Sequence, residues 1–141
     1  MDLRVLVLTA DPDLSSVVRT QAENLGCRCT VHATYDEAVG SIDWADAGIV
    51  DLAGDGLHHL GRLHAEAPDL RTLAIATDAP QEDVARAAGA HLVIVEPFAI
   101  AEVVEAIRAL GPATGDQVID LRAGGASATP EAGDTPWFAT R

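Results

Sequence analysis

The strongest constraint on the fold is an alternation along the chain, in which a short apolar run is followed, five times, by a segment whose apolar residues recur at helical spacing. The apolar runs are nearly continuous, which is typical of parallel strands buried on both faces of a sheet. Right-handed crossovers then place helices on both of those faces. The pattern therefore predicts an α/β fold with a doubly wound, five-stranded parallel sheet. We expect strands at 3–9, 27–33, 47–52, 71–77 and 91–98, and helices at 13–25, 35–42, 56–67, 81–88 and 100–110.

Residues at the ends of the predicted helices support these boundaries. Asp13 is of a type that caps helix N-termini, and Gly26 and Gly89 are of the type that ends helices. Pro68 stops the helix over 56–67 because a proline has no amide hydrogen to donate. The same signals separate each predicted helix from the strand that follows it.

Candidate functional residues come where the predicted strands end. In doubly wound sheets, functional groups gather at the carboxyl ends of the strands. The residues at the strand ends are Thr9, Ala10, Asp11, Asp51, Thr77 and Glu96.

GxGxxG, Walker, HExxH and GxSxG motifs are absent from the sequence, so we expect no enzymatic activity. The spacing of His58, His59 and His64 does not place two imidazoles over one metal ion, and these histidines are expected at the surface or its boundary.

Charge excludes several classes of partner. The chain has 22 acidic and 9 basic residues, giving a formal net charge of −13, and every basic residue is an arginine. A surface this acidic repels phosphate backbones, so we expect no direct binding to nucleic acid. No apolar run approaches the roughly 18 residues that a membrane-spanning helix needs, and we expect a cytoplasmic protein without membrane contact. Any mechanism that requires a lysine of this chain is excluded.

The composition changes after Gly111. Residues 112–141 are rich in Gly, Ala, Thr, Pro and Asp and contain few large apolar residues, which predicts a flexible, disordered tail after a domain over 1–111. Trp137 and Phe138 form an aromatic pair within this segment. They belong either to a frayed terminus or to a short peptide that docks on a partner or on the domain.

Four segments carry a resemblance to a known family: VLVLTADPDL, IVDLAGDGLHHL, LAIATDA and AGAHLVIVEPF. They fall at the spacing of the signature segments of the receiver domain of bacterial response regulators, which take part in two-component phosphorelays, and the resemblance covers residues 3–110. It implies a flavodoxin-like fold with strand order 2-1-3-4-5. It also implies that Asp51 stands at the phospho-accepting position, that Thr77 is the hydroxyl residue ending strand four, and that Pro97 follows a cis peptide bond.

The departures from this family are equally informative. Thr9 and Ala10 occupy the positions where the resemblance implies two magnesium-binding acids, and a neutral pair does not hold a divalent cation. Asp11, one position further on, is a weak candidate to substitute for them. Glu96 stands at the position of the family's lysine, so the charge is inverted where a positive group stabilises the transferred phosphoryl. The sequence therefore predicts no cofactor, with Mg²⁺ held by Asp11 and Asp51 only if phosphorylation is retained.

The leading functional prediction is an atypical, pseudo-receiver-like signalling module that acts by binding proteins. One alternative is a phospho-accepting response regulator that uses Asp51, with Thr77, Glu96 and Pro97 supporting it; another is a ligand-sensing pseudo-receiver. For Asp51 and Glu96 three arrangements compete: divergence into solvent, a proton-sharing pair, and a cation held with Asp11 or Asp55.

The resemblance also implies partners. We expect a signalling protein or a histidine kinase to bind, with homodimerisation as an alternative. In the family, the face built from helix four, strand five and helix five commonly makes such contacts, which here points to the surface around 81–86 and 99–108.

Overall fold

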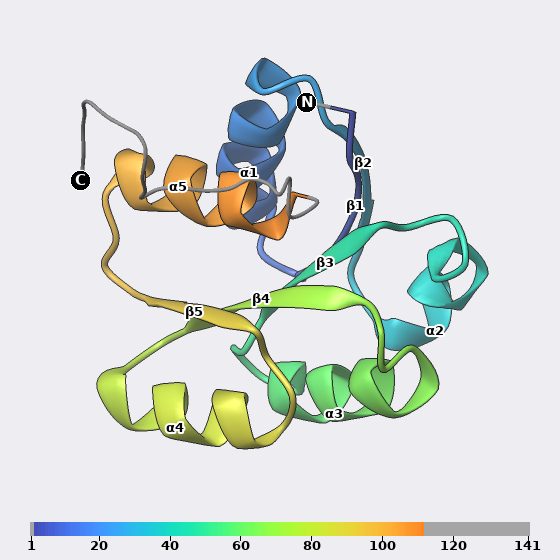
Figure 1. Cartoon of the computed structure of the whole chain (residues 1–141). Helices are drawn as coiled ribbons and strands as arrows, with labels where there is room; N and C mark the ends of the chain where they lie inside the picture. The colour runs from blue at the N-terminus through green and yellow to red at the C-terminus, as the bar shows by residue number, and fades with distance from the viewer. Residues whose placement is uncertain (1, 112–141) are drawn as a thin grey trace, which may run out of the picture. The chain divides into compact units, whose positions relative to one another are not determined.

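The computed structural model describes residues 2–111, and these residues form a five-stranded sheet with helices on both faces (Figure 1). The sheet has the order β2-β1-β3-β4-β5, and every neighbouring pair is parallel. This confirms the predicted doubly wound fold and its strand order. The strands are β1 (Arg4–Leu8), β2 (Arg28–His32), β3 (Ala47–Asp51), β4 (Arg71–Ala76) and β5 (Leu92–Val95), and the helices are α1 (Pro12–Asn24), α2 (Tyr35–Ala38), the 3₁₀ helix η1 (Val39–Ser41), α3 (Gly56–Glu66), α4 (Ala79–Ala87) and α5 (Ile100–Leu110).

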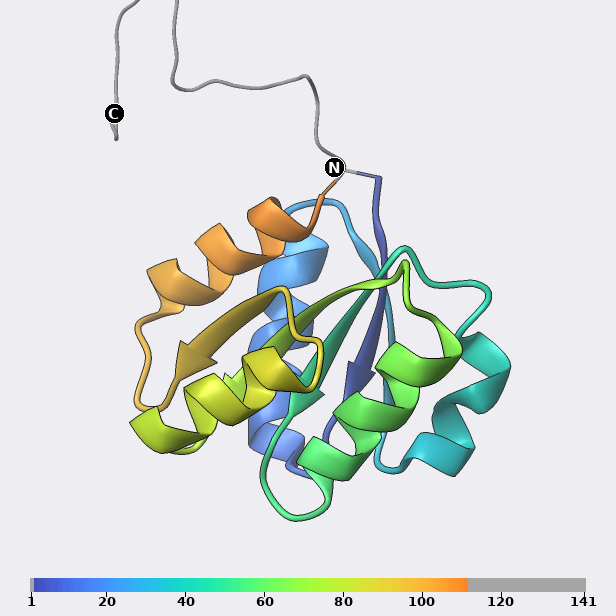
Figure 2. The ribbon, with the colours of Figure 1, turned by 60° about the horizontal axis from the view of Figure 1, so that its bottom comes forward.

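Two layers of helices cover the sheet (Figure 2). Helices α1 and α5 pack on one face, and α2, α3 and α4 pack on the other. Alternate residues of each strand enter the two layers: Val5 and Val7 of β1 belong to the core with α1 and α5, whereas Leu6 and Leu8 belong to the other core. Burial on both sides explains why the central strands read as continuous apolar runs in the sequence.

The helix ends differ in detail from the predictions. The N-cap of α1 is Asp11, whose carboxylate Oδ1 accepts hydrogen bonds from the backbone amides of Asp13 (2.9 Å) and Leu14 (3.3 Å), so the prediction of Asp13 as the cap was wrong. The predicted helix over 35–42 is one α-helical turn followed by η1. Helix α4 begins at Ala79, before the predicted position, because the Asp78 carboxylate caps it.

Helix α2 is fastened to α3 through one buried tyrosine. The Tyr35 hydroxyl donates a hydrogen bond to Glu66 Oε1 at 2.7 Å, and the Arg62 guanidinium lies 4.2 Å from the centre of the Tyr35 ring. Burial of the ring, with the hydrogen bond and charge of Glu66, raises the pKa of Tyr35 to about 12. The neutral hydroxyl is therefore the form that the fold holds.

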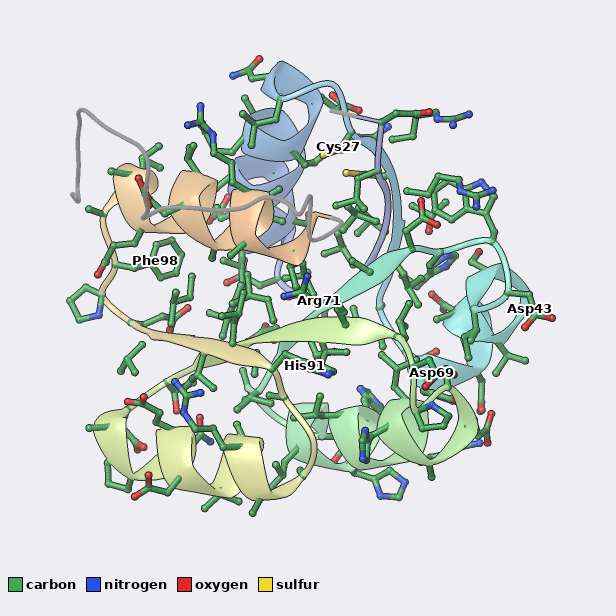
Figure 3. All side chains as sticks on the ribbon, in the orientation of Figure 1. Cys27, Asp43, Asp69, Arg71, His91 and Phe98 are labelled. Carbon is green, nitrogen blue, oxygen red and sulfur yellow. The ribbon has the colours of Figure 1, made fainter. Side chains whose placement is uncertain are left out.

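Just before β5, the His91 side chain takes the place of a backbone hydrogen-bond acceptor for β4. The His91 amide donates to the Thr72 carbonyl oxygen (3.0 Å), and the Thr72 amide donates in return to His91 Nδ1 (3.1 Å). Figure 3 shows His91 at the beginning of β5, ahead of the first residue pair, Leu73 with Leu92. The imidazole thus provides an acceptor for the Thr72 amide, one residue before the β4–β5 residue pairs begin.

Two further predictions concern membrane contact and the tail. Within residues 2–111, none of the helices combines the length and the apolar character needed to cross a bilayer. The predicted tail over 112–141, with Trp137 and Phe138, lies outside the described residues.

Candidate functional site

The carboxyl ends of β1, β3 and β5 bring the predicted site residues to one end of the sheet. A hollow of about 520 Å³ opens there, and we call it the Asp51 hollow. Figure 2 shows the arrowheads of β1 and β3 side by side at this end. The polar residues of its wall are Thr9, Asp11, Thr34, Asp51, Asp55, His59 and Glu96.

Asp51 is a buried carboxylate that the chain itself supports. Its side chain ends β3 and the residue is only 7% exposed. The Thr9 hydroxyl donates a 2.7 Å hydrogen bond to Asp51 Oδ2, and the Ala53 amide donates to Asp51 Oδ1 at 3.0 Å. Both oxygens therefore have a hydrogen-bond donor, as a buried carboxylate requires.

Thr9 connects this carboxylate to the start of α1. It is also 7% exposed, and its hydroxyl oxygen accepts a 3.1 Å hydrogen bond from the Asp11 amide while donating to Asp51. Asp11 in turn uses its carboxylate to cap α1. Thr9, predicted only as a neutral residue in place of an acid, is thus a hydrogen-bond donor to Asp51. The sequence did not indicate this role.

The loop after Asp51 closes against the first residue of α3. Gly56 is buried, and a Cβ atom placed on it would overlap the carbonyl oxygen of Asp51. A glycine is needed here for the close approach of two backbone segments. This contact fixes the position of α3 relative to the end of β3.

Thr77 is directed away from Asp51. Its amide and its hydroxyl both donate to Gln81 Oε1, at 2.8 Å and 3.0 Å, and the residue is exposed and does not line the Asp51 hollow. The hydroxyl matches the family position in sequence but is engaged at the start of α4. Gln81, which was predicted only as part of the partner-contact surface around 81–86, therefore decides where this hydroxyl points.

Glu96 lines the Asp51 hollow from β5 and is half-buried, while Pro97 is exposed beyond it. The peptide bond between them is cis, which confirms the expectation for Pro97. No hydrogen bond joins the Asp51 and Glu96 carboxylates within the described chain. Of the three arrangements considered, Asp51 and Glu96 share one hollow without forming the proton-sharing pair, and Asp51 takes its donors from Thr9 and Ala53 instead.

The wall of the hollow is strongly acidic. Four carboxylate residues line it and, among the residues described there, no arginine does; the chain has no lysine. His59 on α3 also lines the hollow. It was expected merely as a surface or boundary residue, and the structure places it in the wall of the hollow.

The donor set does not fit the Mg²⁺ ion that the resemblance associates with this position. Mg²⁺ requires near-octahedral oxygen coordination, usually with one or two carboxylates and several waters. Thr9 and Ala10 supply no charge, Asp11 Oδ1 caps α1, and both Asp51 oxygens accept hydrogen bonds. Within residues 2–111 no three His, Cys, Asp or Glu side chains are grouped to hold a metal ion.

With this geometry established, the class of fold follows from solved structures. Residues 2–111 have the fold of the receiver domains of response regulators. The receiver domain protein (CheY-like) from Methanospirillum hungatei JF-1 is 20% identical with a TM-score of 0.68, over 77% of this chain and 93% of that chain. A response regulator from Thermotoga maritima is 20% identical with a TM-score of 0.68, over 78% of this chain and 98% of that chain.

A larger protein contains the same fold as one part. NtrX from Brucella abortus in complex with ADP is 20% identical with a TM-score of 0.72, over 78% of this chain. This chain spans 26% of NtrX. None of the protein-family models matches this chain, and no curated protein matches it in sequence. At these identities the similarity establishes the fold.

Proposed function

We propose that this chain is an atypical receiver-type signalling module that acts by binding another protein, without conventional Mg²⁺-dependent phosphorylation and without an enzymatic activity of its own. The observation that carries the proposal is the environment of Asp51. Its carboxylate is buried, bonded to Thr9 and Ala53, and surrounded by other carboxylates in a hollow without lysine or arginine on its described wall. Phosphoryl transfer depends on positive groups that stabilise the transferred phosphoryl, and this wall opposes it.

Exposed apolar residues support protein binding as the output. Val84 on α4 is 47% exposed and Ile100 at the start of α5 is 48% exposed. Both belong to the elements that flank β5, in the predicted contact surface around 81–86 and 99–108. The two side chains are therefore accessible to a partner at the predicted surface. The partner in this proposal is a signalling protein or a histidine kinase, with a homodimer through α4, β5 and α5 as the alternative.

The proposed setting is the cytoplasm, without direct contact to nucleic acid. The net charge of −13 supports this part of the proposal, because phosphate backbones and acidic surfaces repel each other.

Intact-mass measurement tests the absence of phosphorylation. The full chain is incubated with acetyl phosphate and Mg²⁺, beside Asp51→Asn, and we expect the same unchanged mass for both proteins. A mass gain of one phosphoryl group that appears in the wild type and is absent from Asp51→Asn would establish the phospho-accepting alternative instead.

Affinity capture from the native cells tests the binding output. We expect the full chain to retain a specific protein and Val84→Lys with Ile100→Lys to lose it, because a buried ammonium disrupts an apolar contact. A second arm compares the full chain with one that ends at Gly111, which shows whether residues 112–141 are required. Failure of the full chain to retain any protein would contradict the proposal.

The size of the Asp51 hollow supports ligand sensing as a second candidate. Its volume of about 520 Å³ lies in the range of small-molecule pockets, about 300–1,000 Å³. A thermal-shift screen of metabolites tests it, because a ligand at about 100 times its Kd stabilises the fold by about 2.7 kcal/mol. Protection by a ligand that disappears in Glu96→Gln would favour this candidate over a purely protein-binding module.

A further inference from the structure

The four residues of β5, the edge strand of the sheet, include no charged residue and no proline, although the strand is short and Glu96 and Pro97 follow it directly. β5 pairs only with β4, so one row of its backbone amides and carbonyls has no strand partner within residues 2–111. Its four residues, Leu92–Val95, are all aliphatic and half-buried. Exposed edges of this kind are templates for another chain, and proteins usually protect them with charges, prolines or bulges.

The opposite edge is protected. β2 begins with Arg28, whose guanidinium forms an ion pair with Asp2 at 3.2 Å, and ends with His32. A charged residue of this kind within an edge strand opposes pairing with a further apolar strand. The difference between the edges therefore lies in side-chain chemistry and not in topology.

A groove accompanies the β5 edge on the side of α5. It has a volume of about 460 Å³, and we call it the β5–α5 groove. Small side chains on α5, Ala101 and Ala109, leave the groove open, and Glu105 lies between them on the same row of the helix. The β5 side of the groove is formed by Leu92, Val93 and Ile94.

The charge of the groove selects its occupant. Glu102 and Glu105 are the charged residues of its lining, and no basic residue lines it in the described part of the chain. The Glu102 carboxylate already accepts a hydrogen bond from the Ala99 amide at 2.8 Å, whereas Glu105 forms no ion pair within residues 2–111. An apolar groove bordered by a free carboxylate is complementary to a segment that carries aliphatic and cationic side chains.

We propose that the β5–α5 groove receives an extended segment of a partner protein, with alternating aliphatic and Lys or Arg side chains, which adds to β5 as a sixth strand. This inference rests on the proposed function, since it names the chemistry of the partner. Main-chain hydrogen bonds to β5 supply affinity, and alternate side chains fill the groove. A second copy of this chain is the less suitable occupant, because its net charge of −13 repels an identical acidic surface.

Fluorescence anisotropy tests the proposal with a labelled peptide of alternating valine and lysine and the full chain. We expect saturable binding, and Glu105→Lys should weaken it about tenfold or more because a like charge then faces the peptide. Asp43→Lys is the matched control, since Asp43 is exposed and lies beside α2, away from α5 (Figure 3); its Kd should stay within about twofold. A peptide of alternating valine and glutamate should not bind.

Two further measurements keep the test independent of one variant. Ala109→Arg places a long cation in the groove at an exposed helix position and should also abolish binding. In the wild type, the lysine peptide should slow amide hydrogen exchange in Leu92–Val95 and leave β2 unchanged. Equal effects of Glu105→Lys and Asp43→Lys, exchange protection elsewhere, or no peptide binding would overturn the proposal.

The outcomes also separate this inference from the proposed function. If the native partner is retained equally by wild type, Glu105→Lys and Ala109→Arg, the groove is not its site while protein binding stands. If light scattering shows a dimer of the full chain that Ala109→Arg dissociates, a second copy occupies the groove and the basic segment is wrong. If no protein is retained at all, the proposed function itself fails.

Discussion

The Asp51 hollow and the β5 edge lie on the same small sheet but differ in how completely the chain satisfies its own groups. At the hollow, the buried carboxylate of Asp51 has a donor on each oxygen, and Asp11 is engaged as a cap. At β5, which pairs with β4 on one side only, the outer row of backbone groups of an aliphatic strand has no strand partner in the described chain. The Asp51 carboxylate is thus satisfied within the chain, whereas the outer backbone groups of β5 are not.

This difference separates the two parts of the sheet on which the two proposals rest. A buried carboxylate that already has internal hydrogen-bond donors gains nothing from a further partner. An edge strand with free backbone groups, in contrast, can gain hydrogen bonds when another strand pairs with it. Mutations around Asp51 and at Tyr35 test how much these internal contacts stabilise the fold. A mutation beside β5 tests whether the fold is independent of the edge.

The largest effect is expected from Gly56→Ala. Its methyl group would overlap the Asp51 carbonyl oxygen, so α3 or the end of β3 must move, and we expect the free energy of unfolding to fall by about 3 kcal/mol. Gly61→Ala is the control on the same helix: nothing lies within 4 Å of its added Cβ, and it should stabilise by about 0.5–1 kcal/mol. Urea denaturation measures the free energy of unfolding of both variants. Equal stability of the two would show that the backbone around Gly56 accommodates an added Cβ atom.

A smaller loss is expected from Thr9→Val. This change removes the donor to Asp51 Oδ2 at nearly constant volume, and leaving a buried carboxylate oxygen unpaired costs about 1–3 kcal/mol. Thr77→Val removes a hydroxyl that is bonded to Gln81 at the exposed end of β4, and should cost less than about 1 kcal/mol. A larger loss for Thr77→Val, by the same urea titration, would mean that Thr77 and not Thr9 supports the site.

Tyr35 provides a test through pH. Because burial and the Glu66 contact raise its pKa to about 12 from the ordinary 10.0, the folded protein favours the neutral hydroxyl. Its stabilising contribution is complete below about pH 10 and is lost as the pH rises toward about 12. We expect Tyr35→Phe to cost about 1 kcal/mol at neutral pH, and the difference from wild type to shrink across that alkaline interval. A difference that stays constant with pH would contradict the buried hydrogen bond to Glu66.

The smallest effect is expected from Glu105→Lys on the isolated protein. The residue is exposed and forms no ion pair within residues 2–111, so the free energy of unfolding should change by less than about 0.5 kcal/mol. A variant that impairs peptide binding should thus keep nearly the stability of the wild type. A large loss of stability would mean that Glu105 serves the fold instead of a partner.

The sequence predicted the fold because the fold depends on local and repetitive signals. Each apolar run, such as the one that ends at Asp51, reports burial on both faces, and glycines and prolines separate the elements. The same signals fail for one-residue questions: Asp11 and Asp13 are both suitable caps, and only the path of the backbone after β1 chose Asp11.

The site could be predicted only in part, because its decisive contacts are long-range or depend on loop geometry. Positions 51 and 96 were placed correctly at the same sheet end by the strand pattern. The hydrogen bond from Thr9 joins residues 42 positions apart, and a threonine in a strand gives no signal that it faces a carboxylate. Thr77 matched a family position, but its orientation is set by Gln81, four residues later in α4.

The pairing of Thr72 with His91 has a consequence for how the last strand finds its place. A strand that shifts by one residue exchanges its two faces, which would turn Ile94 from the α5 side of the sheet to the α4 side. Because the imidazole accepts the hydrogen bond of the Thr72 amide, such a shift would leave that amide without an acceptor. His91 thus favours one register of β5 against β4, and this register decides which side chains of the edge strand face α5.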